Sequence, residues 1–175
     1  MTISPDFTLP VELVDLARRV IEENRAVGRR VAVAESCTGG LVSSALTEIS
    51  GSSDVFDAGF VTYSNEAKIG LLGVSLDVIE TFGSVSVATA WAMAQGVLKR
   101  TDADVAVAIT GIAGPGGGSE QKPVGTVVFA KAERGTDDSD VSADKKQFGD
   151  LGRAGVRLQA ALCALELLLP EPATP

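Results

Sequence analysis

The sequence predicts an α/β protein, a three-layer α/β/α sandwich around a mixed, mostly parallel sheet. Short β-rich runs alternate with segments of helical periodicity, and the last two β-rich runs are separated only by a polar turn. Hydrophobic residues make up 45% of the 175 residues and aromatic residues only 5%, which is typical of a core of Ala, Val, Leu and Ile. We expect one domain over residues 1–175, with frayed ends at about 1–8 and 170–175.

In the first half of the chain, helices alternate with two β-rich runs. The expected elements are, in order, a helix at 11–27, a strand at 30–34, a helix at 41–50, a strand at 55–64 and short helices at 65–73 and 75–83. Apolar residues at helical spacing lead up to Gly28, which is a typical helix stop. Ser64 stands where an N-cap of the helix at 65–73 is expected.

In the second half, the alternation ends in a hairpin. The expected elements are, in order, a helix at 86–100, strands at 104–110, 124–133 and 141–148, and a last helix at 153–169. The polar run RGTDDSD at 134–140 separates two strands that no helix connects, so we expect these two strands to pair antiparallel. This hairpin is the reason for predicting a mixed sheet.

The acidic balance of the chain limits its partners. The formal net charge of −8 disfavours the broad electrostatic attraction that nucleic-acid binding requires. The apolar-rich end of the chain carries Arg157, Gln159 and Glu166 and stops at Pro170, so it is not expected to cross a bilayer. We therefore expect neither a nucleic acid nor a membrane as a partner.

The cysteine and histidine counts restrict the compartment and the chemistry. Cys37 and Cys163 are too few for a disulfide framework, and no secretory leader pattern is recognisable. A reducing cytoplasm is the expected location. Histidine is absent, which removes the commonest general base and the commonest zinc ligand. Any catalysis must use another base, and no metal site is expected.

Two glycine-containing loops follow predicted strands. They are ESCTGG at 35–40 and TGIAGPGGGS at 110–119. Ligands gather at the carboxyl ends of parallel strands, so both loops can face one pocket. Glycines let backbone N–H groups approach a phosphate or a developing oxyanion. The spacing matches neither the dinucleotide fingerprint nor the P-loop, and a surface turn without function is the alternative.

Ser36 is a candidate nucleophile that needs a base other than histidine. If Ser64 caps its helix, Lys68 lies in the first turn, where the helix dipole and partial burial lower the pKa of a lysine. A neutral Lys68 could then take the proton of Ser36, and Tyr63 could relay or orient it. On the alternative interpretation, Lys68 is a solvated charge and Tyr63 a half-buried packing residue.

The neighbours of Ser36 have competing interpretations. Cys37 is a second candidate nucleophile, because a helix N-terminus favours a thiolate, but it can equally fill space beside the glycines. Thr38 is expected to be a helix N-cap, and Glu35 either holds a substrate group or faces water. Other hydroxyls that could bind a ligand, or serve as ordinary turn residues, are those of Ser84, Thr110 and Ser119.

Several long segments resemble the CinA carboxy-terminal domain family, whose stand-alone members are nicotinamide mononucleotide deamidases. The matching segments are AESCTGGLVSSALTEISGSSDVF, GFVTYSNEAKIGLLGV, GSVS, ITGIAGPGGGSEQKPVGTVVFA and the helix after FGD. They follow one another in order over most of residues 11–169.

The resemblance implies an amidohydrolase that converts nicotinamide mononucleotide and water to nicotinic acid mononucleotide and ammonia, without a metal ion or other cofactor. Ser36 would attack the amide, Lys68 would be its base and Tyr63 would assist. Substrate-binding positions implied with them are Glu35, Cys37, Thr38, Gly39, Gly40, Thr110, Gly111, Gly114 and Arg153. In the family Gly-Asp precedes this arginine directly, whereas Leu151 and Gly152 intervene here, so Arg153 is expected to be displaced.

Two further expectations concern partners. A nucleotide-binding or partner-binding module without turnover, linked to competence or DNA damage as the family name suggests, is the alternative to an enzyme. A homo-oligomer, a dimer first of all, could form through the apolar-rich last helix, although its apolar stripe equally suits the core.

Overall fold

The computed structural model describes residues 8–137 and 142–171, so the predicted fraying of residues 1–7 and 172–175 lies outside the described range. The elements are α1 (Val11–Ala26), β1 (Val31–Glu35), α2 (Leu41–Thr47), a 3-10 turn (Ser52–Asp54), β2 (Phe56–Val61), α3 (Asn65–Leu72), α4 (Leu76–Phe82), α5 (Val87–Leu98), β3 (Val105–Gly111), β4 (Thr126–Glu133), β5 (Ser142–Gln147) and α6 (Gly152–Leu168). Every predicted helix and strand is present.

Among the described residues, no helix combines the length and apolarity needed to cross a bilayer.

The five strands form one mixed sheet in the order β2-β1-β3-β4-β5. The β1–β2 and β1–β3 pairs are parallel, and the β3–β4 and β4–β5 pairs are antiparallel. The mixed α/β class is therefore confirmed, and so is the antiparallel pairing of the last two strands. Parallel pairs are not the majority that the sequence predicted, because the long loop after β3 returns the chain antiparallel and no helix intervenes.

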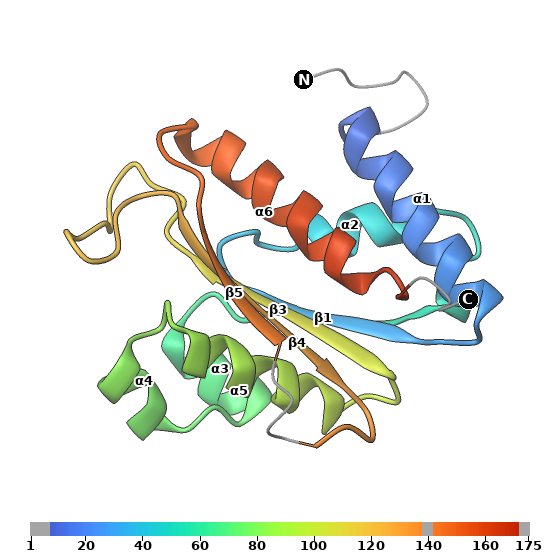
Figure 1. Ribbon diagram of the computed structural model, residues 1–175, viewed down its shortest axis with the longest axis horizontal. Coiled ribbons are helices and arrows are strands. Elements are labelled where there is room, and N and C mark those ends of the chain that lie inside the picture. The colour runs from blue at the N-terminus through green and yellow to red at the C-terminus, as the bar shows by residue number, and fades with distance from the viewer. Residues whose placement is uncertain (1–7, 138–141, 172–175) are drawn as a thin grey trace.

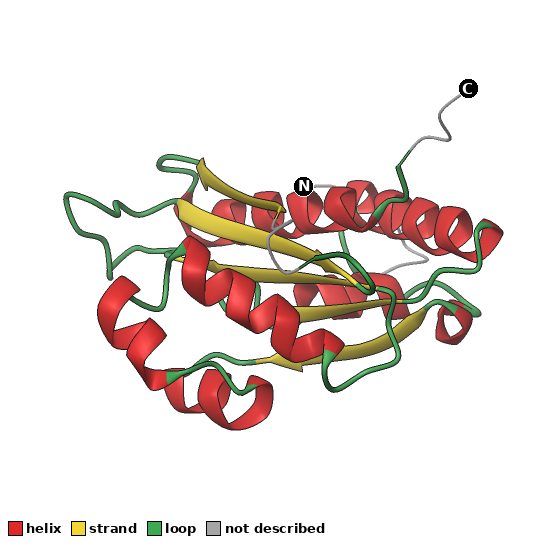
Figure 2. Cartoon of the chain, turned by 60° about the horizontal axis from the view of Figure 1, so that its bottom comes forward, coloured by secondary structure: helices red, strands yellow, loops and turns green. Residues whose placement is uncertain are grey.

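Helices cover both faces of the sheet, with α1, α2 and α6 on one face and α3, α4 and α5 on the other (Figures 1 and 2). The alternation of side chains along a strand separates the two faces by size. On the first face lie Val31, Val33, Val105, Val107, Ile109, Val127 and Phe129. On the second face lie Ala32, Ala34, Ala106, Ala108, Val128, Ala130 and Ala132. The small second face lets α5 approach the sheet closely.

The parallel strands β2, β1 and β3 bring three loops to one edge of the sheet, because their carboxyl ends lie side by side. Main-chain hydrogen bonds extend the pairing by one residue on each side of β1. The N–H of Ser36 donates to Ile109 O at 2.9 Å, and the N–H of Thr62 donates to Glu35 O at 2.8 Å. Ser36 is thereby fixed at the end of the central parallel strand.

Candidate active site

The structure brings Ser36 and Lys68 together across this edge. Lys68 Nζ lies 3.1 Å from Ser36 Oγ and 2.9 Å from Thr62 O. The Lys68 side chain is only 1% exposed and is among the largest fully buried side chains of the described residues. The interpretation of Lys68 as a solvated charge is therefore wrong, and the two groups form a buried Ser36–Lys68 dyad.

The start of α3 explains why Lys68 points into the protein. Ser64 caps this helix as predicted, since its Oγ accepts a hydrogen bond from Ala67 N at 3.0 Å. The helix begins at Asn65, so Lys68 closes its first turn and its N–H donates to Ser64 O. Only three residues separate β2 from α3. This short connection turns Lys68, the one lysine of α3, towards the end of β1.

The surroundings of the Lys68 amine favour its neutral form. Burial lowers the pKa of Lys68, and Cys37 opposes this shift only in part. No carboxylate of the described residues lies within 4 Å of the amine. A neutral amine can donate one proton to Thr62 O while its lone pair accepts the O–H of Ser36. The geometry therefore suits proton transfer from Ser36 to Lys68.

Cys37 is a poor nucleophile in this environment. The side chain is 5% exposed, and burial raises the pKa of its thiol to about 11, with the charge of Glu35 adding to the shift. Arg157 and Lys68 act in the opposite direction without offsetting the effect of burial. The thiol stays protonated near neutral pH, whereas the thiolate is the reactive form. The electrostatics thus favour Ser36 over Cys37.

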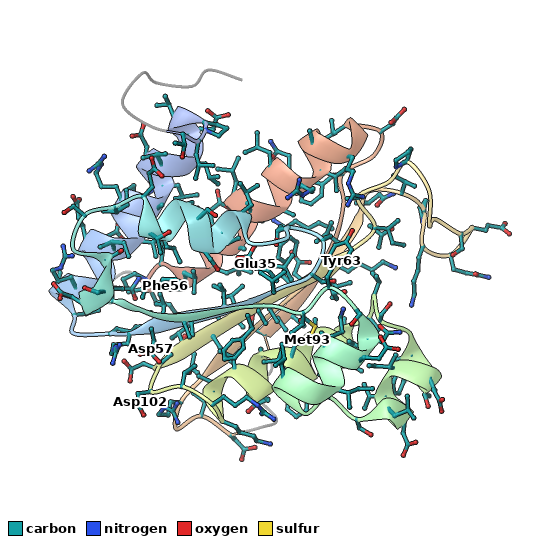
Figure 3. All side chains as sticks on the ribbon, turned by 180° about the vertical axis from the view of Figure 1, so that it is seen from behind. Glu35, Phe56, Asp57, Tyr63, Met93 and Asp102 are labelled. Carbon is teal, nitrogen blue, oxygen red and sulfur yellow. The ribbon has the colours of Figure 1, made fainter. Side chains whose placement is uncertain are left out.

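Glu35 plays neither of the two roles predicted for it. Its side chain, labelled in Figure 3, is fully buried, and its carboxylate accepts hydrogen bonds from the first turn of α2. The donors are Gly40 N (3.0 Å), Val42 N (3.1 Å), Ser43 N (2.8 Å) and Ser43 Oγ (2.8 Å). Glu35 therefore fixes the start of α2 and the intervening loop rather than contacting water or a substrate.

Thr38 is not the N-cap of α2, contrary to the sequence prediction. Gly39 and Gly40 have φ angles of +60° and +96°, and this left-handed turn delays the helix until Leu41. Gly40 takes the N-cap position, and the Glu35 carboxylate supplies the missing side-chain cap. Thr38 is fully buried, and its hydroxyl finds no hydrogen-bond partner among residues 8–137 and 142–171. These three residues shape the loop behind the dyad and do not line the cavity in front of it.

A cavity of about 160 Å³ opens in front of the dyad. Its lining includes the predicted site residues Ser36, Cys37, Tyr63, Lys68, Thr110, Gly111 and Arg153. Asn65, Val85 and Ala113 also line it and were missed, because no residue pattern distinguishes them before the chain is folded. Ser84, which the sequence suggested only as one hydroxyl among several, lies there too.

A second cavity of about 410 Å³ adjoins the first and shares Ser84, Val85, Gly111, Ala113 and Arg153 with it. The glycine loop after β3 forms its wall, with Gly114, Gly116 and Gly117. Lys122 and Arg153 are its charged lining residues, and none of the lining residues is acidic. This cationic, glycine-walled space suits an anionic group next to the dyad.

Arg153 belongs to the site in spite of the two residues inserted before it. Its Nη2 donates to the Tyr63 hydroxyl at 2.9 Å and its Nη1 donates to Gly114 O at 2.8 Å. Arg153 thus connects the loop after β2 with the glycine loop after β3. Tyr63 is 61% exposed, so it is not a half-buried packing residue, and Figure 3 shows it at the end of the parallel strands.

Arg157, one helical turn after Arg153, is a residue that the sequence reasoning missed as part of the site. Its Nε donates to Cys37 O at 3.1 Å and its Nη2 donates to Thr38 O at 3.0 Å. The guanidinium of Arg157 therefore holds the main chain immediately after the nucleophile. The signal was present in the spacing of four residues between two arginines, which places both on one face of a helix.

Thr110 and Gly111 complete the wall next to Ser36. The hydroxyl of Thr110 donates to Ser84 O at 2.7 Å and is buried, so it orders the loop before α5. A Cβ on Gly111 would lie 2.8 Å from Val127 Cγ2 and 3.1 Å from Cys37 Sγ. Only glycine fits there. Among the described residues, no three potential metal ligands of the His, Cys, Asp or Glu type are grouped together.

The chain is similar to known proteins over most of its length. The family model of the CinA C-terminal domain matches residues 13–171. A protein of Enterobacter agglomerans named nicotinamide-nucleotide amidohydrolase PncC is 54% identical over 148 residues, which are 84% of this chain and 87% of that protein. A putative competence-damage inducible protein of Symbiobacterium thermophilum is 57% identical over 108 residues, but these are 62% of this chain and only 25% of that longer protein.

A solved structure has the same fold. The crystal structure of the competence/damage inducible protein CihA from Agrobacterium tumefaciens superposes with a TM-score of 0.87 at 49% sequence identity, covering 96% of this chain and 97% of that chain. The match of the family model extends from α1 to the end of α6 and includes every residue of the cavity in front of the dyad. The chain therefore belongs to the family of CinA C-terminal domains.

Proposed function

We propose that the protein hydrolyses the carboxamide of nicotinamide mononucleotide, giving nicotinic acid mononucleotide and ammonia. The observation that carries the proposal is the buried amine of Lys68, 3.1 Å from Ser36 Oγ and without a carboxylate nearby in the described part of the chain. The similarity to a nicotinamide-nucleotide amidohydrolase over 84% of the chain supports the choice of substrate.

In the first half of the reaction, the serine replaces the amide nitrogen. Lys68 takes the proton of Ser36 as Oγ forms a bond to the amide carbon, and the resulting ammonium ion then gives this proton to the leaving nitrogen. The C–N bond breaks, ammonia departs and an ester of Ser36 remains. In the second half, water attacks this ester, Lys68 again carries the proton, and the carboxylic acid leaves with Ser36 restored.

The tetrahedral intermediate needs N–H donors for its oxyanion. The N–H groups of Gly40, Val42 and Ser43 are occupied by the Glu35 carboxylate, so the start of α2 cannot provide them. Among the described residues, no oxygen atom accepts a hydrogen bond from the N–H of Cys37 or of Thr38, and the N–H of Cys37 meets the sulfur of its own side chain. We assign the oxyanion to these two groups, which directly follow the nucleophile and are held by Arg157.

The rest of the nucleotide has a place in the adjoining cavity. Its glycine wall and the cationic groups of Arg153 and Lys122 suit a phosphate, and local donors of this kind are effective even in a protein of net charge −8. Arg153 also lines the cavity in front of the dyad. A single ligand could therefore place its amide against Ser36 and its phosphate against Arg153.

The test is the release of ammonia from nicotinamide mononucleotide by the purified protein and by Ser36→Ala and Lys68→Met. We expect each substitution to lower kcat by about three orders of magnitude or more, because the two groups act as a unit. Circular dichroism spectra that match the parent protein would exclude unfolding as the cause. Full activity of Ser36→Ala would remove the nucleophile assignment.

The same preparation separates an enzyme from a binding module. Calorimetry with nicotinamide mononucleotide reports binding independently of turnover. Binding without any release of ammonia by the parent protein would favour the non-catalytic alternative and contradict the proposal. Release of ammonia from a panel of related pyridine amides would then define the substrate range.

A further inference from the structure

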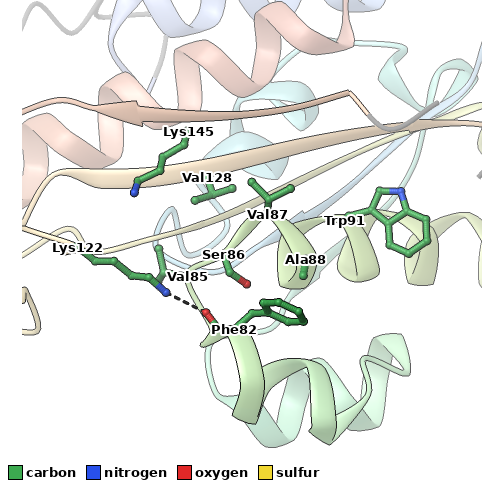
Figure 4. A pocket seen from close by; sticks show the side chains of 9 residues that line it. All are labelled: Phe82, Val85, Ser86, Val87, Ala88, Trp91, Lys122, Val128 and Lys145. Carbon is green, nitrogen blue, oxygen red and sulfur yellow. Dashed lines mark hydrogen bonds between the residues drawn. The ribbon is translucent and has the colours of Figure 1, made fainter. Parts of the chain in front are cut away.

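A groove of about 610 Å³ lies beside the active site, between the α4–α5 corner and the strands β4 and β5. We call it the aromatic groove. The lining residues that matter for its chemistry are Phe82, Val85, Val87, Trp91, Lys122 and Lys145 (Figure 4). Neither the dyad nor any other residue given a catalytic role above lines it.

The two ends of the aromatic groove differ in chemistry. Figure 4 shows the ring of Trp91 at one end and the side chains of Lys122 and Lys145 at the other. Trp91 is the only tryptophan of the chain, and Phe82, which also lines the groove, is 54% exposed. Val87, which lines the same groove, is 46% exposed, and apolar side chains that are exposed together often mark a binding surface.

The charge of the aromatic groove is opposite to that of the whole protein. Two lysines and no carboxylate line it, although the chain carries a net charge of −8. Lys122 Nζ donates to Phe82 O at 2.9 Å. No salt bridge found among the described residues involves Lys145. The groove therefore offers an aromatic surface and positive charge to the same ligand.

The aromatic groove is continuous with the cavities of the active site. Val85 lines the groove, the cationic cavity and the cavity in front of the dyad. Lys122 lines the groove and the cationic cavity. A ligand in the groove would thus lie next to the space that we assign to the substrate's phosphate.

We propose that the aromatic groove binds a nucleotide, with its base against Trp91 and Phe82 and its phosphate against Lys122 and Lys145. Stacking of a base on an aromatic side chain contributes about 10- to 100-fold in affinity. A phosphate would accept hydrogen bonds from the two ammonium groups, neither of which has a carboxylate partner among the described residues. The nucleotide is either free or the second half of a dinucleotide whose phosphates pass Lys122. Only the dinucleotide source rests on the proposed function.

Trp91 provides the measurement. As the only tryptophan, it reports ligands of the groove by its fluorescence, and the Ser36→Ala protein allows titration without turnover. We expect AMP to change the fluorescence of Trp91 in a saturable way, and adenosine and inorganic phosphate to bind at least about tenfold more weakly than AMP. No saturable response to AMP, with calorimetry agreeing, would overturn the proposal.

Matched substitutions test the location of the site. Lys145→Glu should lower the affinity for AMP about tenfold or more. Lys99→Glu makes the same charge change at an exposed position outside the groove and should leave the affinity for AMP unchanged. Equal effects of the two substitutions would reduce the binding to general electrostatics and contradict the proposal. Trp91→Ala should lower the affinity for AMP, measured by calorimetry, by about 10- to 100-fold.

Competition distinguishes the sources of the nucleotide. NAD that binds more tightly than AMP and is displaced by nicotinic acid mononucleotide would identify the second half of a dinucleotide. AMP that binds equally well with and without nicotinic acid mononucleotide would identify a free nucleotide. If the protein does not bind AMP and Phe82→Asp dissociates a dimer of it, the groove belongs to a second copy of the chain and the proposal is refuted. Because ammonia is not measured, failure of the hydrolase proposal would not imitate any of these results.

Discussion

Lys68 determines the chemistry of the site through its protonation state. Burial lowers the pKa of its amine from the ordinary 10.5, and only the neutral amine can take the proton of Ser36. We predict that kcat/KM for nicotinamide mononucleotide rises with pH through a limb whose midpoint lies below 10.5. A pH profile of ammonia release measures this, and a rate independent of pH from acid to alkaline conditions would contradict Lys68 as the base.

The same pKa affects stability, with a definite sign. Between the lowered pKa of the folded protein and 10.5, the unfolded chain holds a proton on Lys68 that the folded protein has released, so unfolding takes up a proton in this range. The free energy of unfolding contributed by this group therefore rises with pH up to about 10.5. Denaturant titrations of the parent and of Lys68→Met as a function of pH should diverge in this direction, because the methionine variant lacks the titrating amine.

Cys37 touches the same cavity but is expected to be dispensable for turnover. With its thiol pKa raised to about 11, it is protonated near neutral pH. Cys37→Ala should keep most of the kcat and lose about 1 kcal/mol of the free energy of unfolding, since a buried sulfur leaves a small void. Ammonia assays together with urea denaturation check both statements. Loss of turnover in a folded Cys37→Ala protein would revive the thiol as the nucleophile.

Residue roles were predictable where one local signal determined them. Ser64 as a cap and Lys68 in the first turn followed from the spacing within one segment. Glu35 and Thr38 were assigned wrongly, because the left-handed turn at Gly39 and Gly40 shifts the start of α2 and brings a strand carboxylate beneath it. Spacing along the chain does not show that a residue of β1 can reach the N-terminus of the following helix.

Helix α6 fixes the site from the opposite end of the sequence. Arg153 contacts Tyr63 and Gly114, whereas Arg157 holds the carbonyl groups of Cys37 and Thr38. We predict that Arg153→Met raises KM about 10- to 100-fold, because the proposed function makes Arg153 a charged partner of the substrate's phosphate. Arg157→Met should instead lower kcat by about tenfold or more, because the main chain after the nucleophile is no longer held in place.

Steady-state kinetics of the two arginine variants separate these effects. The substitutions are chemically identical and one helical turn apart, so each is the control of the other. An increase of KM in both variants, with kcat unchanged, would show that Arg157 serves binding rather than positioning. Equal losses of kcat in both would refute the division of roles along α6.

At the scale of elements, periodicity located every helix and strand but not the balance of the sheet. The alternation of Val and Ala along β1 and β3 even encoded the two unequal faces, since neighbouring side chains of a strand point to opposite sides. The number of parallel pairs was not encoded in the same way. It depends on how the 14-residue loop at 112–125, between β3 and β4, returns the chain to the sheet. A glycine-rich loop of this kind carries no periodic signal.

At the scale of the whole molecule, the dyad joins the two helical layers. Ser36 precedes α2, which packs on the valine-rich face, and Lys68 belongs to α3, which lies on the alanine-rich face. The 3.1 Å between Lys68 Nζ and Ser36 Oγ therefore depends on how both layers pack against the sheet. A change of packing in the α3 layer that leaves every residue of the cavity intact should still disturb catalysis.

Two helical glycines test this dependence. A Cβ on Gly96 of α5 would overlap with the carbonyl oxygen of Leu72 and lie 2.9 Å from Leu72 Cβ, whereas a Cβ on Gly70 of α3 would meet nothing within 4 Å. Gly96→Ala must push the end of α3 away from α5, so we expect a loss of about 1–3 kcal/mol in the free energy of unfolding and a fall of kcat by about tenfold or more as the dyad separates.

Gly70→Ala is the matched control, because it adds the same methyl group to the helix that carries Lys68. It should stabilise the protein by about 0.5–1 kcal/mol, since alanine replaces glycine inside an exposed stretch of helix, and it should leave kcat unchanged. Urea denaturation and ammonia release measured on both variants decide the point. A folded Gly96→Ala protein with the parent kcat would mean that the dyad tolerates displacement of α3, and the coupling of the two layers through the active site would have to be abandoned.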